Sequence, residues 1–111
     1  MSPQRKALEA CARQDGASLS YPFGEQTAVY KVAGKIFAVV GLERRPPQLT
    51  LKCDPEHGEL LRAEHAAITA GYHMNKRHWI TVSLDGSLAP TVIEELIEDS
   101  FDLVAPGGGS S

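Results

Sequence analysis

The spacing of apolar residues changes several times along the chain, and each change predicts a helix or a strand. Apolar residues at helical spacing predict helices at 3–14, 54–65 and 91–104. Short runs rich in β-branched and aromatic residues predict strands at 27–32, 35–41, 49–53 and 78–84. Residues 67–74 fit either a fifth strand or an irregular approach to the last one.

Capping residues support the predicted helix starts. Ser2 precedes a first-turn proline, and Asp54 precedes Pro55 in the same way. Thr91 and Glu94 have the spacing of a capping box for the last helix.

The order helix, three strands, helix, two strands, helix indicates an α+β fold. Short connections between the first three strands favour antiparallel pairing. We therefore expect two layers, an antiparallel sheet with helices on one face. Residues 15–25 are rich in Gly, Ser and Pro and are predicted to form a loop. We expect a single domain over residues 1–104 and a flexible tail at 105–111.

Period-two alternation predicts which strand residues face away from the helices, on a face expected to be open. In the last strand, His78 is expected to face the core and Trp79 to face outward. The full predicted outer set is Trp79, Phe37, Lys35, Lys52, Thr50 and Thr81.

Two predicted loops add basic residues beside this face. "ERRPPQ" contains Arg44 and Arg45, and "MNKR", read as a hairpin turn, contains Asn75, Lys76 and Arg77. Aromatic side chains can stack on bases while the basic groups beside them neutralise phosphates. This combination favours a nucleic-acid-binding surface. The same surface could bind an acidic protein segment. A third interpretation is a partly covered sheet face with solvated lysines.

Charge is unevenly distributed along the chain. The net charge is −3, but residues 31–77 carry eight Lys or Arg and five Asp or Glu. The segment from residue 78 onward carries six acids and no Lys or Arg. Net acidity argues against strong nonspecific nucleic-acid binding, although it leaves room for a local basic patch.

The sequence contains no clear catalytic or metal-binding motif. His65, His73 and His78 do not have the spacing of a compact zinc site. No serine has the context of a nucleophile elbow, and Cys11 and Cys53 are expected to be buried apolar groups. We expect no enzyme activity, metal or cofactor. Without a membrane-helix or signal-peptide pattern, we expect a cytoplasmic monomer with no membrane association.

Four blocks of the chain resemble the YjbR/MmcQ-like family. They are "YPFGEQTAVYKVAGKIFAVVG", "LTLKCDPE", "GYHMNKRHWITVSLDG" and "EELIEDSFDLV", and the resemblance extends from about Leu8 to Val104. It implies a small two-layer α/β fold similar to secretion chaperones, a single domain without a cofactor, and a DNA-binding label. The matching signature positions are Tyr21, Pro22, Phe23, Gly24, Lys35, Phe37, Lys52, Cys53, Gly71, Tyr72, His73, Asn75, Lys76, His78 and Trp79. The resemblance supplies no catalytic residues, and the alternative function is a protein-interaction or chaperone-like module.

Overall fold

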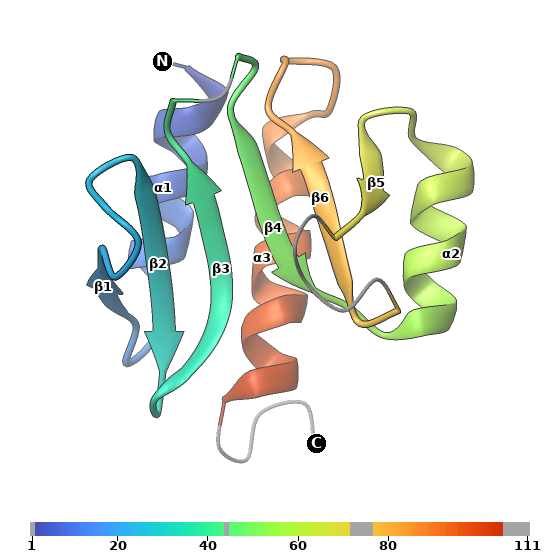
Figure 1. The fold of residues 1–111 in the computed structure, drawn as a ribbon. Helices are drawn as coiled ribbons and strands as arrows, with labels where there is room; N and C mark the ends of the chain where they lie inside the picture. Colours follow the sequence, from blue (N-terminus) through green and yellow to red (C-terminus); the bar gives the residue numbers. More distant parts are fainter. Residues whose placement is uncertain (1, 44, 72–76, 106–111) are drawn as a thin grey trace.

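One antiparallel sheet and three helices make up the part of the chain that the computed structural model describes, residues 2–43, 45–71 and 77–105 (Figure 1). The sheet order is β1-β2-β3-β4-β6-β5. The helices are α1 (Pro3–Ala12), α2 (Pro55–Glu64) and α3 (Pro90–Val104). The strands are β1 (Ser18–Ser20), β2 (Thr27–Val32), β3 (Lys35–Gly41), β4 (Gln48–Lys52), β5 (Ile68–Ala70) and β6 (Trp79–Ser83). This confirms the predicted α+β class and the antiparallel sheet.

Strand β1 was not expected, because residues 15–25 were predicted to form a loop. Ser18 pairs with Lys31 and Ser20 pairs with Val29, which places β1 at the edge of the sheet beside β2. Three residues are too few to display an alternating pattern, so β1 depends on the edge that β2 offers. Strand β5 is shorter than the predicted 67–74, and the last three residues of that prediction lie outside the described residues.

The helix starts follow the predicted capping in two of three cases. The Ser2 hydroxyl accepts a hydrogen bond from the Arg5 N–H at 3.2 Å, and the Asp54 carboxylate accepts one from the Glu56 N–H at 3.0 Å. The capping box predicted at Thr91 was wrong. Helix α3 begins one residue earlier, and its N-cap residue, Ala89, has no side chain that can accept a bond.

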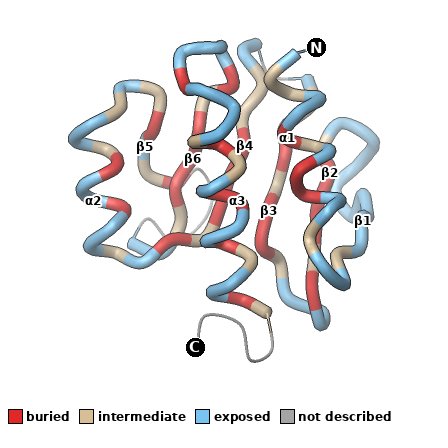
Figure 2. The backbone as a smooth tube through the Cα atoms, turned by 180° about the vertical axis from the view of Figure 1, so that it is seen from behind, coloured by how far each residue is buried: buried red, intermediate tan, exposed pale blue. Residues whose placement is uncertain are grey.

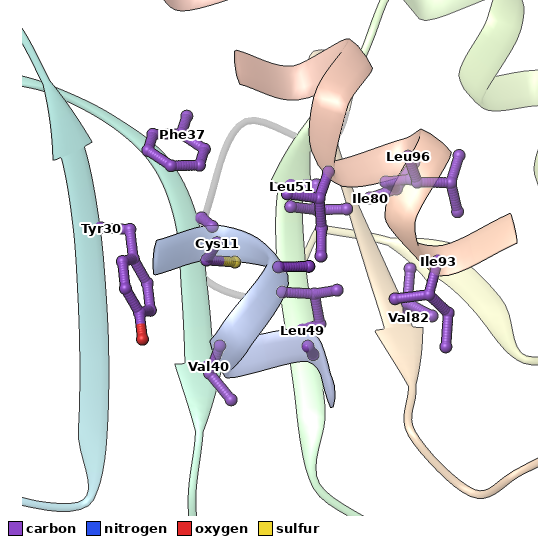
Figure 3. Packing of buried hydrophobic residues seen from close by; sticks show 14 of the residues in the cluster. Cys11, Tyr30, Phe37, Val40, Leu49, Leu51, Ile80, Val82, Ile93 and Leu96 are labelled. Carbon is purple, nitrogen blue, oxygen red and sulfur yellow. The ribbon is translucent and has the colours of Figure 1, made fainter. Parts of the chain in front are cut away.

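Helices α1 and α3 cover one face of the sheet, as the view from behind shows (Figure 2). Their apolar side chains pack on Val40, Leu49, Leu51, Ile80 and Val82 from the strands (Figure 3). Helix α2 lies beside β5, and its Gly58 approaches Ile80 on this same face. The helices therefore share one face, as the sequence predicted.

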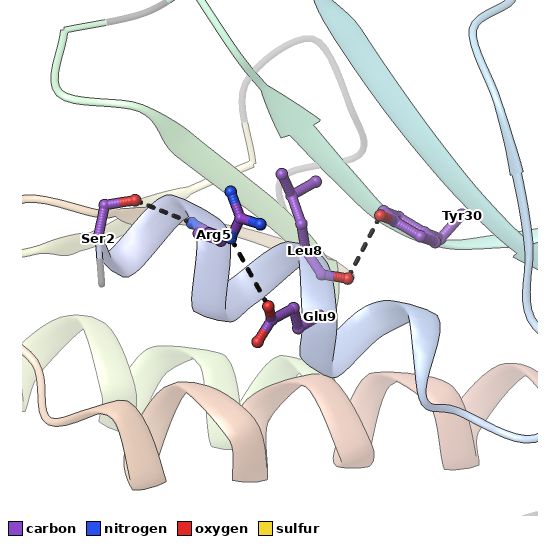
Figure 4. Close-up of polar contacts among 5 residues, drawn as sticks. All are labelled: Ser2, Arg5, Leu8, Glu9 and Tyr30. Atoms are coloured by element: carbon purple, nitrogen blue, oxygen red, sulfur yellow. Dashed lines mark hydrogen bonds and ion pairs between the residues drawn. The ribbon is translucent and has the colours of Figure 1, made fainter.

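Tyr30 connects the sheet to helix α1 through a hydrogen bond (Figure 4). Its hydroxyl donates to the Leu8 carbonyl at 3.3 Å, and burial, with smaller effects of Cys11 and Tyr21, raises the pKa of Tyr30 to about 12. The ion pair between Arg5 and Glu9, at 3.7 Å, is exposed. Exposed pairs contribute little, so burial of the helix face holds α1 in place.

A bulge in β3 changes the direction of Phe37. Tyr30 pairs with Ala38 but Lys31 pairs with Ile36, so Phe37 is an extra residue on its strand. The predicted outward direction of Phe37 was therefore wrong. Its ring is fully buried and meets the Phe101 ring edge-on, with centroids 5.4 Å apart. Simple alternation fails here because it assumes one residue on each strand at every step.

Beside this bulge, the Ser100 hydroxyl bridges the backbones of β3 and β4 with two hydrogen bonds. The β3–β4 ladder ends at the pair Ala38 and Leu51, so the next pair in register would be Phe37 and Lys52. Instead, the Lys52 N–H donates to the Ser100 oxygen at 2.9 Å, and the Ser100 hydroxyl donates to the Phe37 carbonyl at 2.6 Å. Ser100 is fully buried, so α3 is fastened to the two central strands at this point.

Candidate binding surface

The face of the sheet away from the helices carries a row of basic and apolar side chains at one end of the strands. Strand pairing places Lys31 beside Ile36, and Lys52 beside Trp79. All four are partly exposed, and we call them the basic strip. The Lys52 ammonium lies over the Trp79 ring, 5.9 Å from its centroid. This cation–π contact holds a positive charge at the surface beside an aromatic side chain.

The middle of this face is not open, which corrects one prediction. Val29, Thr50 and Thr81 lie in the next row, and all three are buried. The hydroxyl oxygens of Thr50 and Thr81 are 3.4 Å apart, close enough for one to donate to the other. The predicted outward direction of the two threonines was therefore correct, but the prediction that this part of the face is exposed was wrong. Among the described strand residues of this face, the partly exposed basic and aromatic groups lie at the end that carries the basic strip.

The two predicted basic loops do not form one continuous surface in the described residues. Arg45 follows the end of β3 that lies beside Gln48, whereas Arg77 precedes Trp79 at the other end of the sheet. The β4 strand alone separates these ends by about 13 Å, at about 3.3 Å per residue. Arg45 donates to the Leu42 carbonyl at 3.2 Å. The predicted residues Arg44, Asn75 and Lys76 lie outside the described residues.

Two further predictions about direction were wrong. Lys35 pairs with Val32, which points to the helix layer, so Lys35 is exposed at the hairpin end but does not join the basic strip. His78 is exposed, whereas alternation placed it in the core. It precedes the first residue of β6, and its carbonyl accepts a hydrogen bond from the Cys53 N–H at 2.8 Å. Alternation does not apply to a residue before the strand begins.

Trp79 is positioned by a glycine whose role the sequence did not predict. The Gly71 N–H donates to the Trp79 carbonyl at 2.9 Å. A Cβ atom on Gly71 would lie 2.5 Å from the Trp79 Cβ, closer than side chains can approach. Gly71 therefore lets the chain pass directly beside Trp79. The "GYHMNKRHW" stretch offered a signal in its glycine, but only the paired backbone shows what it approaches.

Charge is divided between the two layers. The strands contain three lysines and no acid, whereas α1, α2 and α3 contain nine acids and three Lys or Arg. Helix α3 carries five of those acids and no basic residue. Lys31 and Lys52 therefore offer positive charge on the face away from the helices, although the whole chain has a net charge of −3. A negatively charged ligand would be attracted to the strands and repelled by α3.

The described residues include no group of three or more His, Cys, Asp or Glu placed to hold a metal ion. Cys11 and Cys53 are free and buried, and burial raises the pKa of the Cys11 thiol to about 12. A thiol in that state is a poor nucleophile near neutral pH. Among the described helices, none has the length and apolar character needed to cross a bilayer.

Comparisons with known proteins agree on one family. The model of the YjbR family matches residues 12–103. The uncharacterised protein YbdF of Escherichia coli O157:H7 is 39% identical over 89 residues, covering 80% of this chain and 73% of YbdF. The uncharacterised protein YjbR of Escherichia coli K12 is 37% identical over 94 residues, covering 85% of this chain and 80% of that protein.

Solved structures show the same fold. The Deinococcus radiodurans protein DR2400, described as a DUF419 domain, has a TM-score of 0.80 and 37% identity, with 86% of this chain and 72% of that chain covered. A crystal structure of a Pseudomonas syringae protein has a TM-score of 0.77 and 30% identity, with 90% of this chain and 97% of that chain covered.

Proposed function

This chain belongs to the YjbR family, and we propose that it binds nucleic acid through the basic strip without catalysing a reaction. The observation that carries the proposal is the Lys52 ammonium held over Trp79 on a sheet whose strands contain no acid. Lys31 is on the same row, and Arg77, two positions before Trp79, is exposed. Phosphate contacts from such groups supply most of the affinity of nonspecific nucleic-acid binding. We also propose that the protein works as a cytoplasmic monomer.

Single strands fit the proposed surface better than duplexes do. The basic strip is one row of side chains, and Val29, Thr50 and Thr81 in the row beside it are buried, so the surface is narrow. A phosphate can pair with Lys52 while a base lies against the indole that already supports this ammonium. Base stacking on aromatic side chains contributes about 1–3 kcal/mol per base.

The alternative function, a protein-interaction module, is favoured by a different set of side chains. Leu19, Tyr21 and Phe23 are 47%, 47% and 71% exposed, in and just after the edge strand β1. Exposed aromatic residues are common in protein interfaces. None of these three side chains is basic, so the two functions predict different variants that lose binding.

Salt-dependent titration of a fluorescent single-stranded oligonucleotide tests the proposal. Lys52→Glu should weaken binding to all sequences alike and reduce the salt slope by about 0.7 for each lost phosphate contact. Lys6→Glu on α1 is the matched control, since Lys6 is exposed in the helix layer and the charge change is the same. Equal effects of both substitutions would indicate a response to net charge and refute the surface. If the unmodified protein shows no salt-sensitive binding at low ionic strength, nucleic-acid binding itself is excluded.

A further inference from the structure

A recess lies on the helix side of the sheet, between the start of α2 and the second half of α3. Its volume is about 340 Å³. Ile80, Leu96 and Leu103 supply its apolar lining, and Asp54, Asp99 and Asp102 supply carboxylates. Ligand pockets begin at about 300 Å³, so the recess has room for one or two side chains.

The apolar lining continues onto the surrounding surface. Leu103 is 51% exposed although it lines the recess, and Leu60 is 60% exposed on α2. Leu60 follows His57, another lining residue, by three positions, so both lie on the same side of α2. Exposed leucines around an apolar recess indicate a surface that another molecule covers.

Acidic side chains outnumber lysine and arginine in the lining of the recess. The Cys53 thiol also lines it, and the pKa of that thiol is raised first by burial and then by the charges of Asp54 and Asp99. Arg62 acts in the opposite direction but contributes least. The lining includes one lysine, Lys52, against three carboxylates, so a cationic group is favoured.

The backbone that carries these carboxylates is anchored in the core. Asp99 and Asp102 flank Ser100, whose buried hydroxyl joins Lys52 and Phe37. Asp54 is the N-cap of α2 and is fixed by its bond to the Glu56 N–H. Little ordering is therefore needed when a ligand arrives, which favours binding.

We propose that this recess binds a basic segment of a partner protein, with one apolar side chain in the recess and Lys or Arg on either side. The apolar side chain packs against Leu96 and Leu103, and the basic groups pair with Asp99 and Asp102. The recess opens on the helix side, and Lys52 borders both it and the basic strip. The recess and the basic strip are therefore neighbouring surfaces that share Lys52.

The test is a nuclear magnetic resonance titration of the full ¹⁵N-labelled chain with three acetylated, amidated pentapeptides. The probe is Lys-Arg-Leu-Lys-Arg. Lys-Arg-Ala-Lys-Arg keeps the charge without the apolar anchor, and Glu-Glu-Leu-Glu-Glu keeps the anchor with the opposite charge. We expect only the first to shift the amide signals of Cys53, Asp99 and Leu103. Equal shifts with the alanine peptide, or no shifts at millimolar peptide, would overturn the proposal.

Paired variants separate a specific site from general attraction to an acidic helix. Asp99→Asn with Asp102→Asn should weaken binding of the leucine peptide by about three- to thirtyfold, as expected for two partly exposed ion pairs. Glu95→Gln with Glu98→Gln removes the same charge from α3 outside the recess lining and should change affinity less than about twofold. All four side chains are exposed, so both variants should keep the wild-type melting temperature. Equal losses in the two variants would refute the recess as the binding site.

Discussion

Removing one hydroxyl, in Ser100→Ala, should destabilise the whole fold. Its oxygen lies between the Lys52 N–H and the Phe37 carbonyl, one position beyond the last pair of the β3–β4 ladder. Alanine fits the helix and the volume, so the loss is almost entirely one of hydrogen bonds. Without the Ser100 hydroxyl, the Phe37 carbonyl and the Lys52 N–H lose this hydrogen-bond partner. Both groups lie beside fully buried residues.

The expected magnitude follows from the two groups. An unsatisfied buried donor or acceptor costs about 1–3 kcal/mol, so two of them cost about 2–6 kcal/mol. We expect a loss of about 3 kcal/mol in the free energy of unfolding, because partial movement of the strands relieves some of the cost. Domains of this size have only about 5–15 kcal/mol in total, so the melting temperature should fall by about 12 °C.

Urea denaturation followed by far-ultraviolet circular dichroism measures this change. Ser20→Ala is the control, because Ser20 is exposed on β1 and undergoes the same chemical change. The control should stay within about 0.5 kcal/mol of the wild type. A loss below about 1 kcal/mol for Ser100→Ala would show that the hydroxyl does not bridge the strands as described.

Three other predictions concern backbone geometry and pH. Gly71→Ala should lower stability by about 1–3 kcal/mol in thermal melts, because its Cβ meets the Trp79 Cβ; an unchanged melt would contradict that approach. Ala33→Asn should raise the melting temperature, because Ala33 has a φ of +51°, a left-handed conformation that asparagine tolerates better; a lower value would contradict it. Cys11 and Tyr30 have pKa values raised to about 12 from 9.0 and 10.0. Burying their neutral forms therefore contributes fully below about pH 9 and is progressively lost toward pH 12, so the urea midpoint should fall between about pH 8 and pH 11; a constant midpoint would refute this.

Much of the fold could be predicted because its elements are marked locally. The bounds of β2 and β3 match the prediction, and the turn between them uses Ala33 and Gly34, both with positive φ. Helix α3 differs by one residue at its start. Alternating strands and continuous apolar stripes depend on neighbours within the same segment, and such neighbours can be seen in a sequence.

The parts that could not be predicted depend on contacts between distant segments. The bulge at Phe37 is visible only once β2 and β3 are paired, and it reverses the direction of a key aromatic side chain. Ser100 reaches a carbonyl 63 positions away. Of the predicted binding residues, Lys52 and Trp79 come together in space. Arg77 is two positions before Trp79 in the chain, and Arg45 belongs to the other end of the sheet.

The separation of charge between the layers gives this molecule an electric dipole, which can orient it in solution. A particle with net charge −3 should drift away from a polyanion, but its acids are concentrated in the helices and its strands are positive. In the field of a polyanion the molecule experiences a torque that turns the strands forward before any contact forms. The same asymmetry should let one population of molecules adhere at low ionic strength to both anion- and cation-exchange resins, each through a different layer.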